Sequence, residues 1–413
     1  MHPSATLVIN QRSKEMIAAG QRVFKLGLGQ SPFPVPRPVV EALKLHAREK
    51  DYLPVKGLAA LRREVAEYHR RRDGIAARPD DVLIGPGSKE LMFLLQLVYY
   101  GDLVVPTPAW VSYAPQARIV GRNIYWLPTS ASDGWQVTPG HLESLCHDDP
   151  DRPRIVVLNY PNNPTGGTYR ASELRVLAEV ARRHRVILLS DEIYGELNFR
   201  GRHNSIACYY PEGAIVSGGL SKWCGAGGWR LGTFLFPESL AWLRDAMAAV
   251  ASETYTSTSA PIQFAAVRAY QGGLEIERYL HASRRVLRSL GRWCWRRLSE
   301  AGLDVPEPKG AFYLFPDFES RRERLAERGV QTSFDMCEQL LEETGVAILP
   351  GSAFGRPPEE LTARLAYVDF DGARALATVE RMSPDERMDS EILRRIAPSV
   401  VEAIDRLAEW CSS

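Results

Sequence analysis

Short runs of β-branched and apolar residues alternate with segments whose apolar residues recur at helical spacing, from about residue 58 to residue 290. This order is typical of βαβ units arranged around a mainly parallel sheet. The expected strands cover residues 82–84, 103–106, 155–158, 186–190, 214–217 and 231–236. Several are apolar throughout, as parallel strands buried on both faces are. The sequence therefore predicts an α/β fold, with a large domain whose mainly parallel sheet is sandwiched by helices.

Two of the helices expected between these strands have a clear apolar face. In each, apolar residues recur at spacings that place them on one side of a helix. The members are Leu58, Leu61, Val65 and Tyr68 in the first helix, and Leu174, Leu177, Ala178 and Ala181 in the second. These faces are expected to pack on the sheet.

From about Ile276 the pattern changes to a long, Arg-rich amphipathic helix. Short strands over residues 312–315, 346–349 and 365–368 follow, and then a terminal helix. We therefore expect a smaller α+β domain of residues 1–45 and 290–413, beside a large α/β domain of residues 46–289. The Pro-rich piece at residues 32–38 is expected to form a rigid loop, because each Pro fixes φ.

The charges of the 413 residues almost cancel, since 51 Lys and Arg face 50 Asp and Glu. Nucleic-acid binding normally needs a clustered excess of cations to displace counterions, so no such partner is expected. No apolar run approaches the roughly 20 residues that span a bilayer. The first residues also lack the apolar region of a secretory signal. We expect a cytoplasmic protein that does not enter a membrane.

The six cysteines form no Cys-x-x-Cys pair, and the eight histidines form no cluster with ligand spacing. Reduced thiols in a cytosolic enzyme fit this pattern better than a disulfide framework or a zinc site. No metal is therefore expected.

Lys222 stands in a setting that is unusual for a lysine. The chain has only 8 Lys, and Lys222 is the only one between Lys89 and Lys309. It lies in a Gly-rich stretch of residues 218–230 that follows an expected buried strand. A desolvated ammonium beside another cation loses its proton more easily, which a Schiff-base nucleophile requires. A surface lysine in a Gly-rich turn is the alternative. A phosphate-binding Gly loop is a weaker one, because the Gly spacing matches neither a P-loop nor the dinucleotide-binding fingerprint.

Two further polar motifs come directly after expected strands. Asn-Tyr-Pro-Asn-Asn-Pro-Thr-Gly, at residues 159–166, follows the strand at 155–158, and Ser-Asp-Glu-Ile-Tyr, at residues 190–194, ends the strand at 186–190. Open α/β sheets bind their ligands at the carboxyl ends of strands. Both motifs are therefore expected at the ligand-binding edge.

These motifs resemble those of the class I/II aminotransferases, which are pyridoxal-phosphate (PLP) enzymes of fold type I. The resemblance rests on Asn-Pro-x-Gly, on Asp-x-x-Tyr and on Ser-Lys with an Arg eight residues after the Lys, in this order. Matching segments run from Gly27 to Arg364, nearly the whole chain. The resemblance implies that PLP is the cofactor, held by the large domain, and that the protein is a homodimer with shared active sites.

The resemblance also implies roles around the cofactor ring. Lys222 would carry the cofactor as a Schiff base and then move the α-proton of the substrate. Asp191 would pair with the protonated pyridine nitrogen and keep the ring an electron sink, while Asn163 and Tyr194 would hydrogen-bond the phenolic oxygen. On the residues alone, Asp191 could cap a helix, Asn163 could be a turn residue, and Tyr194 could be a core aromatic.

The cofactor phosphate is expected at the turn of residues 85–89, which opens a helix from Glu90. Backbone N–H groups and the helix dipole would hold the anion there, at Gly87 and Ser88. Ser88 alone would pass for an ordinary N-cap. The resemblance adds Arg230 as a charged contact, and Tyr52 as the residue that reaches the phosphate of the neighbouring subunit.

Three further residues match family positions that contact the face of the cofactor ring or the substrate. Trp110 occupies the position of the family's ring-stacking aromatic, although a lone Trp is more often part of a core. Arg364 matches the binder of the substrate α-carboxylate, for which a guanidinium fork is suited. Gly29 lies in a segment similar to one whose backbone covers the substrate, and Asn163 is expected to contact the substrate as well.

Two positions depart from the family pattern. The phosphate-binding Ser or Thr that the family carries three residues before the lysine is Gly219 here, which leaves Ser217 or Ser221 as replacements. Lys89 stands where many relatives have a small or neutral residue. In some prokaryotic aspartate aminotransferases a lysine in this turn meets the side-chain carboxylate of the substrate. The alternative is that Lys89 only neutralises the cofactor phosphate.

The resemblance therefore implies a PLP-dependent aminotransferase that moves an amino group from an acidic, aspartate-like amino acid to a 2-oxo acid such as 2-oxoglutarate. Another fold type I chemistry is the first alternative, because C–S lyases, enzymes like aminocyclopropane-carboxylate synthase and amino-acid oxidases share the same residues. A transcription regulator with an aminotransferase domain is a poorer match, since the family match begins by Gly27 and is expected to leave no room for a DNA-binding domain. A dehydrogenase would need the Gly-x-Gly-x-x-Gly fingerprint between a strand and a helix.

Overall fold

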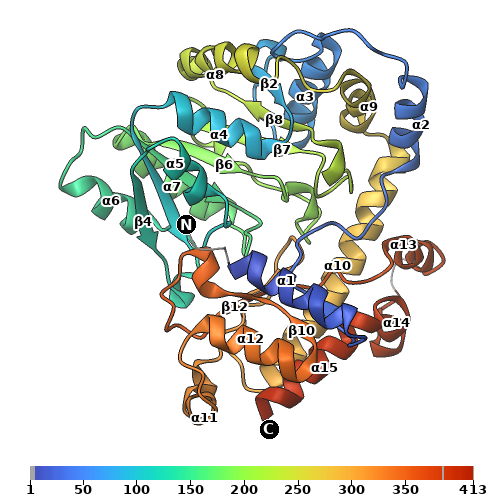
Figure 1. Cartoon of the computed structure of the whole chain (residues 1–413). Helices are drawn as coiled ribbons and strands as arrows, with labels where there is room; N and C mark the ends of the chain where they lie inside the picture. The colour runs from blue at the N-terminus through green and yellow to red at the C-terminus, as the bar shows by residue number, and fades with distance from the viewer. Residues whose placement is uncertain (1–4, 384–385, 413) are drawn as a thin grey trace.

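A seven-stranded sheet forms the centre of the larger of two bodies in the computed structural model, which describes residues 5–383 and 386–412 (Figure 1). The spatial order is β2-β8-β7-β6-β5-β3-β4, and β8 alone runs antiparallel to the other strands of this sheet. The strands are β2 (Val82–Gly85), β3 (Asp102–Thr107), β4 (Ile124–Pro128), β5 (Arg154–Asn159), β6 (Ile187–Asp191), β7 (Ala214–Gly219) and β8 (Gly232–Leu235).

Three neighbouring strands bring their carboxyl ends to one edge of this sheet. Asn159 of β5 lies opposite Asp191 of β6, and Asp191 lies opposite Ser217 of β7. Because these strands are parallel, the segments that follow them start from the same edge. The two polar motifs and the Lys222 segment therefore meet there.

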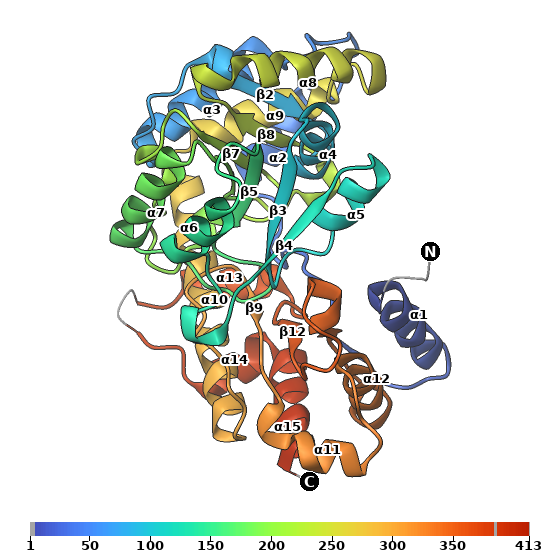
Figure 2. The same cartoon turned by 90° about the vertical axis from the view of Figure 1, so that its left-hand side faces the viewer.

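Helices cover both faces of the sheet (Figures 1 and 2). Leu103 and Val105 of β3 join a core with α4 (Ser88–Val98), α5 (Tyr113–Ile119) and α8 (Ala241–Thr254). Val104 joins the core on the opposite face, with α3 (Ala59–Arg72), α6 (Pro139–His147), α7 (Ala171–Arg183) and α9 (Ala260–Gln271). This alternation follows from the two-residue period of a strand. The predicted α/β sandwich is confirmed.

The smaller body joins the two ends of the chain. β1 (Phe24–Lys25) pairs with β10 (Val346–Ala347), and a second sheet has the order β11-β12-β9. The strands of that sheet are β9 (Tyr313–Leu314), β11 (Leu349–Pro350) and β12 (Ala363–Ala366). Its helices are α1 (Ala5–Ala18), α11 (Arg322–Glu327), α12 (Ser333–Thr344), α13 (Gly372–Glu380), α14 (Ser390–Ile396) and α15 (Pro398–Ser412).

One long helix, α10 (Leu274–Glu300), runs from the larger body into the smaller one (Figure 2). Near the other end of the chain, α2 (Arg37–Leu45) packs against α9 of the larger body. The boundaries at residues 45 and 290 stay predictions. Within the described ranges, no helix combines the length and the apolarity that crossing a membrane requires.

The local predictions differ from the structure in a few places. The edge strand β4 was not predicted, and its central side chains, Tyr125 and Trp126, are exposed. Helix α4 begins at Ser88 rather than Glu90, with Gly87 as its N-cap, so Ser88 is not the cap. Pro38 lies in the first turn of α2 instead of in a loop. A Pro is tolerated there because the first N–H groups of a helix have no partner within the helix.

Candidate active site

A cavity of about 460 Å³ lies at the carboxyl ends of β5, β6 and β7. It collects side chains from six segments that are far apart in the sequence. The predicted site residues among its walls are Gly29, Ser88, Lys89, Trp110, Asn163, Asp191, Tyr194, Lys222 and Arg230. A cavity of this size suits a small ligand with a few polar contacts.

Lys222 follows β7, and its amine is enclosed by the N-terminal segment. Its Nζ donates a hydrogen bond to the carbonyl oxygen of Gly29 at 2.7 Å. Burial and, to a smaller extent, the nearby guanidinium of Arg364 lower the pKa of Lys222 to about 8, while Asp191 acts in the opposite direction. A surface lysine in a Gly-rich turn would have no such environment. The lowered pKa leaves part of the amine unprotonated near neutral pH.

Asp191 is the last residue of β6 and is buried. The hydroxyl of Tyr113 donates to its Oδ2 at 2.6 Å, and Ser217 Oγ lies 3.4 Å from its Oδ1. Burial raises the pKa of Asp191 to about 6, although these hydrogen bonds and Lys222 oppose the shift. No α-helix begins directly after Asp191, only the short 3-10 helix Gly195–Leu197, so it does not serve as an α-helix N-cap.

A buried arginine connects the Asn163 motif with the N-terminal segment. Arg364 donates from one NH group to Oδ1 of Asn163 at 3.3 Å and from the other to the carbonyl of Gly27. Its Nε has no hydrogen-bond partner among the described residues. Tyr194 shares a 2.7 Å hydrogen bond with the hydroxyl of Tyr313, whose ring centre lies 4.9 Å from the Arg364 guanidinium. Arg364 thus has a spare donor in this corner.

The turn before α4 combines a helix N-terminus with a cation. Gly87 is the N-cap and has a φ of +97°, which favours glycine. Arg230, also at positive φ, donates to the carbonyl oxygens of Gly227 at 3.0 Å and Pro86 at 3.4 Å. A Cβ on Gly232 would come within 2.1 Å of the Ser88 nitrogen. A small anion fits such a turn, since backbone N–H groups and the helix dipole point at it.

Lys89 lies beside the predicted ring-stacking residue. Its ammonium is 5.2 Å from the centre of the Trp110 ring. Burial lowers the pKa of Lys89, and the charge of Arg230 adds to this effect. Among the described residues, no carboxylate forms an ion pair with Lys89, so its charge is available to a ligand.

Three predicted site residues lie outside the cavity wall. Gly87 directly precedes Ser88 in the chain, Arg364 is hydrogen-bonded to Asn163, and Tyr52 is 88% exposed on the surface. Gly219 lines a different cavity, together with Ser217, while Ser221 lines the cavity that contains Lys222. Of the two serines considered as replacements for a phosphate contact, Ser221 therefore lines the predicted site, whereas Ser217 contacts Asp191.

Sequence reasoning missed three residues of this site: Tyr113, Tyr313 and Asn159. The amide of Asn159 donates to the carbonyl of Asp191 at 2.8 Å, and its oxygen accepts from the Asn163 nitrogen at 2.7 Å. Asn159 thereby ties the two motifs together. Nothing in the local sequence marks the hydroxyls of Tyr113 and Tyr313.

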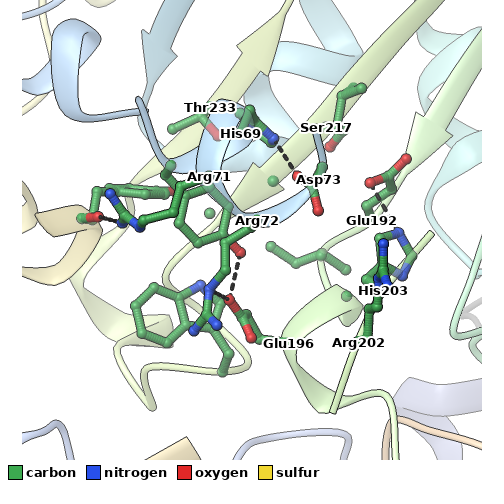
Figure 3. Close-up of a pocket in the computed structure, with 18 of the residues that line it drawn as sticks. His69, Arg71, Arg72, Asp73, Glu192, Glu196, Arg202, His203, Ser217 and Thr233 are labelled. Atoms are coloured by element: carbon green, nitrogen blue, oxygen red, sulfur yellow. Dashed lines mark hydrogen bonds and ion pairs between the residues drawn. The ribbon is translucent and has the colours of Figure 1, made fainter. Parts of the chain in front are cut away.

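A second cavity, of about 370 Å³, is lined by Glu192 and Ile193, which follow β6, and by the end of α3 (Figure 3). Its charged side chains mostly pair with one another: His69 with Asp73 at 2.8 Å, Arg72 with Glu196 at 3.0 Å, and His203 with Glu192 at 2.9 Å. Ile193 lines both cavities. The two cavities are therefore adjacent.

The family model for aminotransferase class I and II matches residues 21–370. The chain belongs to this family. The predicted family and the predicted transaminase class are confirmed. The aminotransferase is 34% identical to the aspartate aminotransferase of Geobacillus stearothermophilus, over 88% of this chain and 92% of that protein.

Two other comparisons agree with this assignment. The aspartate/prephenate aminotransferase of Cereibacter sphaeroides is 31% identical to this aminotransferase, over 89% of this chain and 92% of that protein. The solved structure of the aspartate aminotransferase of Thermus thermophilus with maleate has a TM-score of 0.83 and 28% identity, covering 99% of this chain and 97% of that one. The family and the fold therefore agree over nearly the full length.

Proposed function

We propose that the cavity containing Lys222 binds PLP and transfers an amino group from an acidic, aspartate-like amino acid to a 2-oxo acid such as 2-oxoglutarate. The main support for this proposal is that one cavity holds two suitable groups. They are a lysine whose pKa is lowered to about 8 and a buried carboxylate, Asp191, at the end of the neighbouring strand. These are the two groups that PLP chemistry needs on its aldehyde and on its ring nitrogen.

The residues present fit this cofactor. The turn at Ser88 and the guanidinium of Arg230 suit a phosphate, and Trp110 offers an aromatic face to a planar ring. Asp191 suits a protonated ring nitrogen, and Asn163 and Tyr194 offer polar atoms to a phenolic oxygen. When bound, PLP supplies an electron-accepting ring next to the substrate α-carbon.

Lys222 has two tasks in this proposal. Its unprotonated amine would hold the cofactor and, once displaced by the substrate amine, would move the proton at the substrate α-carbon. The 2.7 Å hydrogen bond to Gly29 holds the amine in the cavity. Asp191, kept ionised by the Tyr113 hydroxyl, holds the positive charge on the cofactor ring.

Two cations suit an amino acid with two carboxylates. Arg364 retains an unpartnered Nε and a planar fork, which suits the α-carboxylate. Lys89 has no carboxylate partner among the described residues and suits a second one. The names of the relatives, aspartate aminotransferase and aspartate/prephenate aminotransferase, support an acidic substrate.

A homodimer is part of the proposal, because Tyr52 is 88% exposed and does not line the cavity of its own chain. In the homodimer its hydroxyl reaches the phosphate site of the neighbouring subunit. Tyr52→Phe is then expected to weaken PLP binding in a sample that sedimentation shows to be dimeric. Unchanged PLP affinity would contradict the shared site. The cytoplasmic location stays a prediction.

Half-reaction spectra test the transferase proposal. Protein loaded with PLP and mixed with aspartate alone should convert to the pyridoxamine form, and 2-oxoglutarate should return it to the starting spectrum. Absence of a clean return would favour a lyase or an oxidase on the same residues. A screen of donors, read at the cofactor absorbance, then identifies the preferred amino acid.

Lys89→Ala tests the acidic substrate separately. The variant should raise KM for dicarboxylic donors more than for neutral ones, because only the former present a second carboxylate to the ammonium. An equal change for both donor classes would instead assign Lys89 to the cofactor phosphate.

A further inference from the structure

Glu192 follows Asp191 on the chain but points to the opposite side, into the second cavity (Figure 3). Successive residues at the end of a strand point in opposite directions. The Glu192 side chain is only 5% exposed, and Glu192 does not line the cavity that contains Lys222. A buried carboxylate is costly unless its oxygens are satisfied, so its contacts are informative.

Both oxygens of Glu192 are engaged. Oε1 accepts hydrogen bonds from Ser205 at 2.6 Å, Ser190 at 2.8 Å and the Tyr160 hydroxyl at 3.2 Å. Oε2 lies 2.9 Å from Nε2 of His203. Three hydroxyl groups and one imidazole therefore converge on a single carboxylate.

The contacts of Glu192 join both segments that carry predicted cofactor contacts. Tyr160 begins the Tyr-Pro-Asn-Asn segment that ends at Asn163, and Glu192 lies between Asp191 and Tyr194. The backbone repeats the link, since the Tyr160 nitrogen donates to the carbonyl of Asp191 at 3.3 Å. A shift of the Glu192 side chain would move both segments together.

His203 is the partner of the second oxygen of this carboxylate, at 2.9 Å. Its ring stacks on Tyr160 with centroids 5.1 Å apart, and its side chain is 8% exposed. Burial lowers the pKa of His203, but Glu192, with smaller contributions from Asp73 and Glu196, more than offsets this, so that the net shift is upward. The upward shift of the His203 pKa favours the protonated imidazole beside Glu192.

We infer that Glu192 and His203 are positioning residues for the cofactor: their ion pair fixes the Asp191–Tyr194 segment against the Tyr160–Asn163 segment. The inference rests on the proposed function, since it concerns PLP. Removal of either partner leaves the other buried and unpaired. The two segments then separate slightly, and the groups they present to the cofactor lose their alignment.

The chain offers a matched control in the same cavity. His69 and Asp73 form a second buried pair at 2.8 Å, with each side chain 7% exposed. Both belong to the end of α3 and have no contact with either cofactor-carrying segment in the hydrogen bonds described. His69→Gln removes a similarly buried imidazole from its carboxylate partner, but away from the two segments.

The test titrates full-length apoprotein with PLP and follows absorbance for His203→Gln, Glu192→Gln, the double variant and His69→Gln. Each of the first two should raise the Kd for PLP about tenfold. The Kd of the double variant should not exceed that of the single variant that binds PLP less tightly, because the two residues act as one pair. His69→Gln should leave the Kd unchanged, even though its apoprotein melts at a lower temperature.

Three results would overturn the inference. An unchanged Kd in Glu192→Gln and His203→Gln would show that the ion pair has no influence on the cofactor. An equal rise in His69→Gln would show a general loss of stability. Additive effects in the double variant would show that the two residues act separately. Wild-type protein that binds no PLP would overturn the proposed function as well, which separates the two failures. Glu192→Gln keeps the test possible if His203→Gln does not fold.

Discussion

The two cavities that share the Asp191–Ile193 segment use buried charge in different ways. In the second cavity the carboxylates already have partners within the protein, as Glu196 has in Arg72 at 3.0 Å and Arg284 at 2.5 Å. In the cavity of Lys222, the pKa of the lysine is lowered, and no carboxylate pairs with Lys89 among the described residues. The first set of charges stabilises the structure, and the second set is available to a ligand.

This difference explains why charge or cavity shape alone does not identify the site. Both cavities have a similar volume, about 370 and 460 Å³, and both contain arginines and carboxylates. Paired buried charges satisfy one another, whereas an unpaired buried charge persists only where something compensates its cost. Charges that the fold leaves without partners therefore indicate the reactive cavity. The predictions that follow test this contrast, beginning with the largest effect.

Asp191→Asn should lower kcat about 10³-fold, because a preorganised charge at the cofactor ring is lost. Its matched control is Asp73→Asn in the second cavity, which removes an equally buried carboxylate from His69. The control should keep kcat within about twofold while it lowers the free energy of unfolding. Steady-state kinetics and urea denaturation measure both. A similar loss of kcat in both variants would contradict the claim that the two cavities use their buried charges differently.

Glu196→Gln should lower the free energy of unfolding by about 3 kcal/mol. The variant leaves the guanidinium groups of Arg72 and Arg284 without their shared buried carboxylate, which also accepts from Tyr68 at 2.8 Å. Denaturant titration of the apoprotein measures the change. Unaltered stability would mean that these pairs do not hold the second cavity together.

Tyr113→Phe should raise the Kd for PLP by at least about tenfold, since hydrogen bonds to charged groups contribute roughly 1.5–3 kcal/mol. The variant keeps the ring, which lies edge-on to Trp110 with centroids 5.2 Å apart, and removes only the hydroxyl that donates to Asp191. In an Asp191→Asn background the same change should have a much smaller effect. Equal effects in both backgrounds would show that Tyr113 does not act through Asp191.

The pH dependence of cofactor association should report Lys222. Its pKa is lowered to about 8, and only the unprotonated amine attacks an aldehyde, so the reactive fraction rises with pH. From pH 7 to pH 8 the association rate of PLP with apoprotein should rise about fivefold. Pyridoxamine phosphate, which lacks the aldehyde, is the control and should show no such rise. A rate that falls over this interval would contradict the lowered pKa.

The fold could be predicted where burial leaves a pattern in the sequence. The buried strands β5, β6 and β7 are runs of apolar residues, and the alternation with helices indicated their parallel order. Edge strand β4 was missed because only one of its five residues, Leu127, is buried, so it has no continuous buried run. The start of α4 was missed because glycine N-caps such as Gly87 leave a weaker signal than a side-chain cap.

The site could be predicted where a residue belongs to a motif after a strand. Lys222, Asp191 and Asn163 were found in this way and line one cavity. The spare donor of Arg364 and the hydroxyl of Tyr313 depend on how distant segments pack, which local patterns do not encode. The same holds for Glu192 and His203, which meet across 11 residues of chain only once the segment after β6 has folded back.

The most direct test of the account is to find which lysine binds the cofactor. Protein incubated with PLP is reduced with borohydride, digested, and analysed by mass spectrometry for the reduced cofactor. The account predicts one modified peptide, carrying the mass on Lys222, and no modification at that position in Lys222→Ala. Modification of Lys89 or Lys309 in place of Lys222, or none at all, would contradict it.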